Sequence, residues 1–151
     1  MHFTERLVSP VPIAVAWDFV WDPGRMAGCL PGCVGVEEIE AGRRYRALLE
    51  DRIGPYRVHV SLDVSVLGTE PMKLIRLLAT GEDRTLGVSQ RIDLTVRLRA
   101  DGPSQTGLDM DAEVEVTGAI AALGGFLVKR KAVDIVRQLA RNVDAGLRAA
   151  A

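Results

Sequence analysis

The C-terminal segment constrains the fold of this chain most, because it has the pattern of one long amphipathic helix. From about Ala119 to Ala149, apolar residues recur at the spacing of one helix face; they include Ile120, Leu123, Leu127, Val136, Leu139, Val143 and Leu147. A helix of about thirty residues is roughly 45 Å long. Such a helix can cross a whole β-sheet and needs an apolar surface of that extent.

The middle of the chain supplies such a surface as a series of strands. The clearest runs from Val58 to Val66, where apolar and polar residues alternate. The same period of two returns around Tyr45–Leu49, Leu86–Leu98 and Leu108–Val116, whereas Lys73–Gly81 is more continuously apolar. Strands with one dry and one wet face indicate an antiparallel sheet that is covered on one side only.

Turn residues separate these segments and define the order of elements. Gly54-Pro55, Gly68-Thr69-Glu70-Pro71 and Asp101-Gly102-Pro103 have the composition of turns. Before them we expect a strand over His2–Ser9 and a short helix over Ile13–Trp21.

A second short helix should follow, with Asp22 as N-cap and Pro23 in its first turn, and end near Cys29. Leu30-Pro31-Gly32-Cys33 then forms a turn. This order predicts one two-layer α+β domain over residues 1–151.

The charge balance argues against a nucleic-acid partner. A net charge of -1 provides no overall basic field for a polyanion. Residues 119–151 nevertheless hold six basic and two acidic residues. The outer face of the last helix is therefore either simply solvated or a contact for an acidic partner or anionic lipid, at roughly 1 kcal/mol per charge near such lipid.

Apolar runs, the first residues and the cysteines and histidines indicate the cellular compartment and whether a metal is bound. No window reaches the eighteen or so apolar residues of a membrane span, and the first residues lack the pattern of a secretory signal. Cys29, Cys33, His2 and His59 lack the spacing of a structural zinc site. We expect a cytoplasmic protein with reduced thiols and no bound metal.

Catalytic constellations are nearly absent from the sequence. It has no nucleophile elbow, phosphate loop or dinucleotide fingerprint. His59 falls on the wet face of its strand. Period two also places an acidic ladder on one outer face, where we expect it to be solvated: Asp109, Asp111, Glu113 and Glu115. We therefore predict no catalytic residue.

The inward positions offer little bulk with which to fill the space beneath a long helix. Aromatic residues make up only 5% of the chain, and several inward positions are small: Gly124, Ala132, Ala47, Ala79 and Ala112. A dry hollow of about 300 Å³ would cost on the order of 7 kcal/mol, which rivals the stability of a whole domain. Either close packing removes the hollow, or water or an apolar ligand occupies it.

Two polar residues interrupt the dry faces. Gln90 lies between Val88 and Ile92, and Asp51 follows the alternating segment that ends at Leu49. A buried polar group needs a partner, so Gln90 either donates to a carbonyl of a bound ligand or is satisfied within the protein. For Asp51 we expect a bulge near Gly54 to turn the carboxylate outward.

Residues 12–33 resemble a known family. Ala16-Trp17-Asp18-Phe19-Val20, then Asp22-Pro23 and Leu30-Pro31-Gly32-Cys33, is similar to the CoxG family of carbon monoxide dehydrogenase subunits, within the START-like (SRPBCC, Bet v 1-like) superfamily. The Gly54-Pro55 hairpin and residues 118–124 fit the same pattern, so the resemblance covers nearly the whole chain. It implies a helix-grip fold: a curled antiparallel sheet of about six to seven strands, two short helices, and a long C-terminal helix over a cavity.

The resemblance also implies a function. Members of this family look like accessory proteins and not catalysts: they bind an isoprenoid quinone or a similar apolar ligand. They link a molybdenum hydroxylase, such as carbon monoxide dehydrogenase, to the membrane quinone pool. A protein of this kind would be cytoplasmic, with peripheral contact at the inner face of the cell membrane.

We predict that ligand-lining residues come from the lid, the sheet and the last helix. In that order they are Trp17, Met26, Leu30 and Pro31; Leu49, Leu62, Gln90, Leu94 and Met110; and Leu123, Phe126 and Leu127. For Trp17 and Phe126, ordinary core packing is the competing interpretation.

Two other functions remain open. One is a START-like cyclase or dehydratase, which needs acid–base groups aimed into the cavity; Gln90, Asp51 and Tyr45 are the candidates. The other is a protein-only adaptor, recruited through the basic helix face or through Leu30-Pro31-Gly32.

Overall fold

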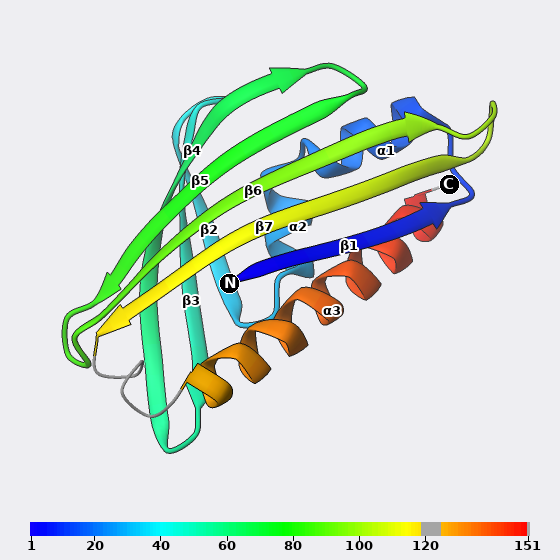
Figure 1. Cartoon of the computed structure of the whole chain (residues 1–151). Coiled ribbons are helices and arrows are strands. Elements are labelled where there is room, and N and C mark those ends of the chain that lie inside the picture. Colours follow the sequence, from blue (N-terminus) through cyan, green and yellow to red (C-terminus); the bar gives the residue numbers. More distant parts are fainter. Residues whose placement is uncertain (119–124, 151) are drawn as a thin grey trace.

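The computed structural model describes residues 1–118 and 125–150, which form a curled antiparallel sheet and three helices (Figure 1). The strands are β1 (His2–Ser9), β2 (Cys33–Glu40), β3 (Arg44–Ile53), β4 (Tyr56–Glu70), β5 (Leu74–Asp83), β6 (Val88–Ala100) and β7 (Thr106–Gly118). The helices are α1 (Ile13–Val20), α2 (Pro23–Cys29) and α3 (Gly125–Ala150). The expected start of the last helix at Ala119, and with it Leu123 and Gly124, lies outside the described residues.

The seven strands form one sheet in the order β1-β7-β6-β5-β4-β3-β2. Every pair of neighbours is antiparallel. Strands β2 to β7 follow one another as a meander, and β1 pairs with β7 at the far edge. The predicted α+β architecture, with a curled sheet of six to seven strands and a long C-terminal helix, is confirmed.

The three helices lie on the concave side of the sheet (Figure 1). Helix α3 crosses this side and contacts β1, β3, α1 and α2. Near its C-terminal end, Nδ2 of Asn142 donates a hydrogen bond of 2.8 Å to the carbonyl of Cys29. The long helix is thereby tied to the end of α2.

Local turn chemistry explains where the strands begin and end. Gly54 has a φ of +58°, and the register Ile53↔Tyr56 confirms the predicted hairpin between β3 and β4. The turn expected at Gly68 is wrong. β4 instead continues to Glu70, because the register shift next to Gly68 absorbs one extra residue as a bulge.

The interior contains two separate clusters of buried residues. One lies where α1, α2 and the C-terminal half of α3 meet β5, β6 and β7, and it includes Phe19, Leu108, Val143 and Leu147. The other lies on β3, β4 and the starts of β6 and α3, and it includes Ala47, Val58, Val60, Leu62, Val88 and Val128. Members of both clusters border the space between the sheet and α3.

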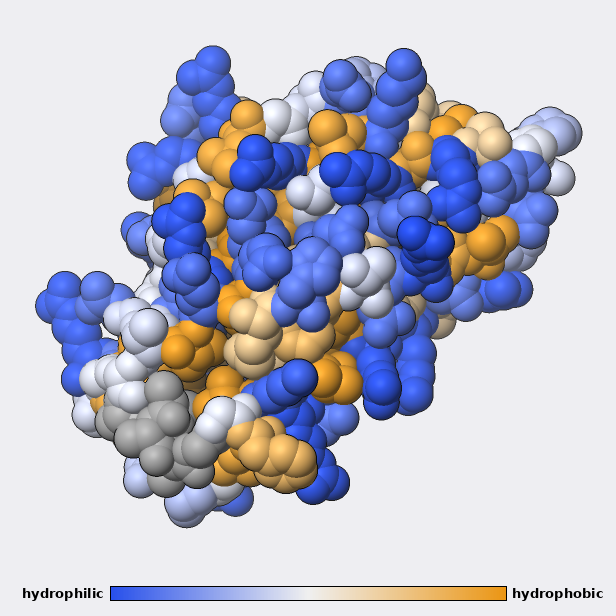
Figure 2. Space-filling view, in the orientation of Figure 1, coloured by the Kyte–Doolittle hydropathy of each residue, from blue (hydrophilic) through white to orange (hydrophobic). Residues whose placement is uncertain are grey.

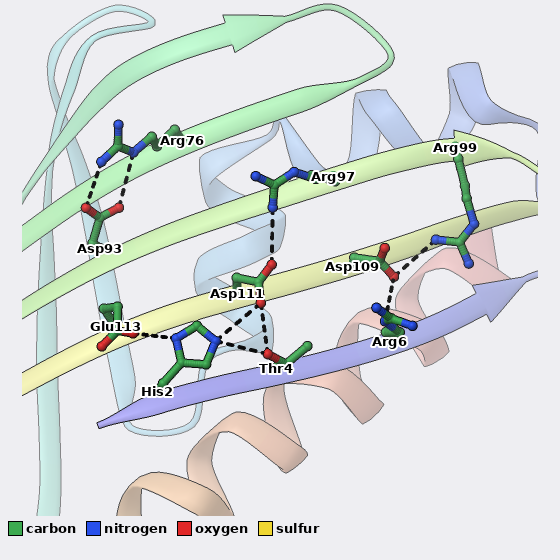
Figure 3. A network of polar contacts seen from close by, with 10 residues as sticks. All are labelled: His2, Thr4, Arg6, Arg76, Asp93, Arg97, Arg99, Asp109, Asp111 and Glu113. Carbon is green, nitrogen blue, oxygen red and sulfur yellow. Dashed lines mark hydrogen bonds and ion pairs between the residues drawn. The ribbon is translucent and has the colours of Figure 1, made fainter.

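The convex face of the sheet is polar, as the alternation predicts. Three members of the acidic ladder, Asp109, Asp111 and Glu113, pair there with basic residues of β1 and β6 (Figure 3). Nη1 of Arg97 lies 3.1 Å from Oδ2 of Asp111, and Nη1 of Arg99 lies 3.1 Å from Oδ1 of Asp109. The predicted outward position of His59 is also confirmed, since its side chain is largely exposed.

Candidate functional site

A cavity of about 340 Å³ lies between the concave face of the sheet and the N-terminal half of α3. Strands β3 to β7 contribute most of its wall, and α2 with the following turn closes one side. The lining is mostly aliphatic; β4 alone supplies Val58, Val60, Leu62, Val64 and Val66. Its volume lies at the lower end of the range for small-molecule pockets.

Small side chains create this space. Ala47, Ala79 and Ala112 line the cavity from the sheet, and Ala132 lines it from α3. These are the positions at which the sequence predicts a lack of bulk. The methyl groups leave room between the sheet and the helix, whereas larger side chains would close it.

Seven of the predicted ligand-lining residues lie along the cavity. They are Met26, Leu30, Pro31, Leu49, Leu62, Gln90 and Leu94. They come from α2, the turn after it, and strands β3, β4 and β6, so the fold brings together residues that are far apart in sequence. Their part in binding a ligand stays a prediction.

Four other predicted residues lie elsewhere. Trp17 and Met110 are buried in the first core cluster, and Trp17 stacks on Trp21 with ring centroids 5.9 Å apart. The tryptophan that lines the cavity is Trp21, one helical turn later. Phe126 is 79% exposed and therefore does not face the interior.

Leu127 is the fourth of these residues. It packs against the β3–β4 hairpin, where its Cδ2 atom lies 3.2 Å from the position of a Cβ on Gly54. It thus seals the hairpin tip against α3 and does not line the cavity. Leu123 lies outside the described residues.

One ion pair lies in this apolar lining and was missed by the sequence analysis. Nζ of Lys131 lies 2.9 Å from Oδ1 of Asp51, and each side chain is 31% exposed. The expectation that Asp51 turns outward is wrong. The two-residue hairpin keeps β3 and β4 in register up to Ile53, so the inward alternation of Leu49 continues through Asp51.

Helical spacing could have revealed Lys131 as the partner. It follows Val128 by three positions and precedes Ile135 by four, and both of these residues line the cavity. A lysine at this spacing points to the same side as the apolar stripe. Its flexible stem then carries the ammonium group to the carboxylate.

The Leu-Pro-Gly-Cys turn lies directly beside this ion pair. The N–H of Glu50 donates a hydrogen bond of 2.8 Å to the carbonyl of Gly32. Gly32 has a φ of +83°, and a Cβ there would lie 2.9 Å from the carbonyl oxygen of Glu50 and 3.5 Å from Oδ2 of Asp51. Only glycine combines this conformation with such a close approach, so the motif fixes the lid against β3.

Groups with acid–base or nucleophilic chemistry are scarce around the cavity. The cysteine that lines the cavity is Cys33. Cys29 lies in the first core cluster, where burial raises the pKa of its thiol and keeps it protonated and poorly nucleophilic. The hydroxyl of Tyr45 accepts a hydrogen bond of 2.9 Å from the N–H of Gly42, and so supports the β2–β3 turn. The arrangement favours binding of an apolar molecule over chemistry on it.

A curled antiparallel sheet that encloses an apolar cavity beneath a long C-terminal helix is a START-like fold. Within that class the chain belongs to the CoxG family of carbon monoxide dehydrogenase subunits, whose profile matches residues 9–148. The resemblance noted for residues 12–33 is therefore confirmed over most of the chain.

Solved structures agree on the fold. A conserved protein from Geobacillus kaustophilus superposes with a TM-score of 0.85 at 19% identity, covering 97% of this chain and 95% of that one. A START superfamily protein from Mycobacterium smegmatis gives 0.77 at 17% identity, covering 99% of each chain. The Zhui aromatase/cyclase from Streptomyces sp. R1128 gives 0.70 at 13% identity, covering 99% and 92%.

At these identities the likeness establishes the fold and not a shared activity. Among curated proteins, no similar sequence is found. Within residues 1–118 and 125–150, the helices lack the combination of length and apolar character needed to cross a membrane.

Proposed function

We propose that this protein is a non-catalytic accessory protein that holds an isoprenoid quinone, or a similar apolar molecule, in the cavity beneath α3. In this role it connects a molybdenum hydroxylase, such as carbon monoxide dehydrogenase, with the quinone pool of the membrane. The observation that carries the proposal is the aliphatic cavity of about 340 Å³.

Energetics support an occupant. A dry void of this volume would cost on the order of 8 kcal/mol, comparable with the whole stability of a domain. An apolar ligand restores the missing contacts, and bound water is a poor alternative because it needs two to four polar partners. Apart from Asp51 and Lys131, whose ion pair joins β3 to α3, the walls are mostly aliphatic.

The end of the molecule where α3 begins has the character of a membrane contact. We call this the basic end; it comprises Arg52, Arg57, Phe126, Lys129 and Arg130. All five side chains are exposed, and within the described residues none of the four cations forms an ion pair. Figure 2 shows hydrophilic and apolar side chains next to one another at this lower end of the view.

The basic end is arranged in a way that favours an anionic partner. Arg52 stands directly opposite Arg57 in the β3–β4 register, and like charges in that position are destabilising. The contact between Leu127 and the hairpin at Gly54 places these arginines at the same end as Lys129. Anionic lipid attracts each basic residue by roughly 1 kcal/mol, and an exposed Phe126 can enter the lipid interface.

The ligand is tested by purifying the protein without detergent, extracting it with organic solvent, and analysing the extract by mass spectrometry. We expect an apolar passenger, and we expect added quinones to raise the melting temperature of extracted protein. A protein that is repeatedly free of any passenger and gains no stability from quinones would contradict the proposal.

The membrane contact is tested by co-sedimentation with vesicles of phosphatidylglycerol or of phosphatidylcholine. We expect binding only to the anionic vesicles, and we expect Lys129→Glu/Arg130→Glu to abolish it. Arg137→Glu/Arg141→Glu makes the same charge change further along α3 and serves as the matched control. Equal losses for the two variants would mean that overall charge, and not the basic end, determines binding.

The link to a molybdenum hydroxylase rests on membership of the family. It is tested by mixing hydroxylase, its substrate and a quinone with and without this protein. We expect the protein to accelerate quinone reduction, and an unchanged rate would contradict this part of the proposal.

A further inference from the structure

We propose that Asp51 and Lys131 form a head-group site that selects apolar ligands with a neutral hydroxyl group over ligands whose head is a carbonyl, a cation or an anion. The inference rests on the proposed function, because it concerns the same cavity. It adds the chemistry by which the cavity recognises one end of its ligand.

The first step is the position of the ion pair. Both residues belong to the cavity lining, and they join the sheet to α3 where the Leu-Pro-Gly-Cys turn meets β3. Each side chain is 31% exposed, whereas the neighbouring residues Val58 and Val128 are buried. Solvent therefore reaches this point of the cavity, and a ligand would place its polar end here and its apolar part deeper inside.

The second step is the hydrogen-bonding capacity that the pair leaves available. Oδ1 of Asp51 accepts a hydrogen bond of 2.7 Å from the N–H of Arg52 and lies 2.9 Å from Nζ of Lys131 in the ion pair. Oδ2 has no hydrogen-bond partner among residues 1–118 and 125–150. Nζ carries three N–H groups, of which the ion pair uses one. One acceptor and two donors thus remain at the same place.

The third step matches ligand chemistry to these groups. A single hydroxyl group can donate to Oδ2 of Asp51 and accept from Nζ of Lys131 at the same time. A carbonyl can only accept, so it could accept from Nζ of Lys131 but would leave Oδ2 of Asp51 without a donor. A charged head of either sign would meet a like charge at one member of the pair. The site therefore discriminates in favour of a neutral hydroxyl.

Gln90 does not duplicate this site. Its register partner on β5 is Gly81, which pairs in turn with Leu62 on β4. Gln90 and Asp51 are therefore three strands apart, or about 14 Å across the sheet at an ordinary spacing. A small ring cannot reach both, and the ion pair is the polar feature at the solvent-reached end.

For a quinone carrier the preference has a definite consequence. The reduced ring carries hydroxyl groups where the oxidised ring carries carbonyls, so the reduced form binds more tightly. By linkage, a site that prefers the reduced form makes the bound quinone easier to reduce. That property suits a carrier whose ligand accepts electrons from a partner enzyme.

The test uses four probes that share a decyl chain: decylhydroquinone, its dimethyl ether, decylbenzoquinone and decylbenzene. Affinities for the whole chain are measured anaerobically by quenching of tryptophan fluorescence, because Trp21 lines the cavity. Since a hydrogen bond to a charged group is stronger than one between neutral groups, we expect the hydroquinone to bind about tenfold or more tightly than the ether and the benzoquinone.

Two variants locate the preference. Asp51→Asn keeps the side-chain volume and should weaken hydroquinone binding by about 10- to 100-fold, with decylbenzene changed by less than about threefold. Asp51→Leu/Lys131→Met removes both charges together, which proteins often tolerate without loss of stability, and should abolish the preference. Asp134→Asn/Arg137→Met, on the exposed side of α3, is the matched control.

The outcomes separate the two proposals. If decylbenzene binds but the hydroquinone has no advantage, or if the double variant keeps that advantage, the head-group site is wrong and the apolar cavity stands. If none of the four probes binds, the proposed function fails and the head-group site with it. Melting temperatures of all variants establish that each one is folded.

Discussion

The two halves of α3 cover very different interiors. The C-terminal half buries Val143 and Leu147 completely against α1 and the sheet, and we call this region the filled end. The N-terminal half places Ala132 and Ile135 along a cavity of about 340 Å³, and we call this region the hollow end. One continuous helix on one continuous sheet thus makes a core in one place and a pocket in the other.

The two ends differ in how much side-chain volume the surrounding helices and strands contribute to the interior. Helix α1 delivers Trp17 and Phe19 to the filled end, and the ring of Phe19 comes so close to Gly146 that there is no room for a Cβ. The hollow end receives alanines from the strands instead. Stability therefore depends mainly on the filled end, which leaves the hollow end free to accept a ligand.

Truncation at the filled end gives the largest expected effect. Leu147→Ala should destabilise the protein by about 2–5 kcal/mol, because the surrounding core cannot collapse onto the new void. Leu49→Ala at the hollow end should cost only about 1 kcal/mol, since Leu49 already borders a cavity. Urea denaturation measures both values from the shift of the midpoint at constant slope.

Equal losses of stability for Leu147→Ala and Leu49→Ala would contradict the difference between the two ends. Such a result would mean that the hollow end is packed as tightly in solution as the filled end. The ligand-free and ligand-loaded proteins should be compared separately, because an occupant adds contacts to Leu49 and none to Leu147.

Adding one carbon atom at the filled end should give the second-largest effect on stability. A Cβ on Gly146 would lie 2.7 Å from Cε2 of Phe19, so Gly146→Ala should cost about 1–3 kcal/mol although alanine favours helices. Gly28→Ala, in α2, is the matched control, because nothing lies within 4 Å of its Cβ position. It should be neutral or stabilising by up to about 1 kcal/mol.

The clash with Phe19 can be verified by a double mutant. Phe19→Leu should remove part of the penalty of Gly146→Ala, and the two changes should therefore be non-additive by about 0.5 kcal/mol or more. Simple additivity would show that Gly146 is needed for a reason other than the ring. The filled end would then have more free space than the structure indicates.

Filling the hollow end should change binding more than stability. Ala132→Phe places an aromatic ring in the cavity and should weaken binding of an apolar probe at least about tenfold, while it changes the free energy of unfolding by about 1 kcal/mol or less. Ala149→Phe adds the same ring at an exposed position of α3 and should alter neither. Unchanged probe affinity in Ala132→Phe would place the ligand elsewhere.

The contrast between the ends also explains what the sequence could predict. Six of the seven strands were predicted; alternation located four of them, β3, β4, β6 and β7, and helical spacing located α3, because both patterns depend on which face is buried. Strand β2 was not predicted: Cys33–Glu40 is rich in glutamate, lies at the sheet edge and is mostly exposed. It forms a strand because its backbone hydrogen-bonds to β3, and this pairing leaves no pattern in the local sequence.

The individual site residues were harder to predict, for geometric reasons. Trp17 and Trp21 are one turn apart on a short helix that is apolar on most sides, so sequence alone does not say which ring meets the cavity. The inward position of Asp51 depends on the register of a two-residue hairpin. Phe126 does not interrupt the apolar pattern of the last helix, yet its side chain is exposed to solvent.

Acidification should give the smallest effect and should act first at the hollow end. The carboxylate of Asp83 accepts hydrogen bonds from the N–H groups of His59, at 3.0 Å, and Leu86, at 3.1 Å. The first of these is the main cause that lowers the pKa of Asp83. The same bonds hold the β5–β6 turn, which carries Leu86 and Val88 to the second core cluster.

The sign of the pH dependence follows from this lowered pKa. A carboxyl group whose pKa is lower in the folded protein contributes stability above its unfolded pKa of about 4, and this stability is lost as the pH falls through the folded value. Between about pH 5 and pH 3, hydrogen-exchange protection should therefore fall for amides at the β5–β6 turn before it falls for Val143 and Leu147. Asp83→Asn should remove this difference.

Asp93→Asn provides the matched control for acidification. The hydrogen bond from Arg76 likewise lowers the pKa of Asp93, but this pair lies on the polar outer face of the sheet (Figure 3). Such an exposed pair contributes little to stability because solvent screens it, and its loss should leave the order of exchange unchanged. If both ends of wild-type protein lose protection together, they unfold as one unit, and the hollow end is not the weaker part of the fold.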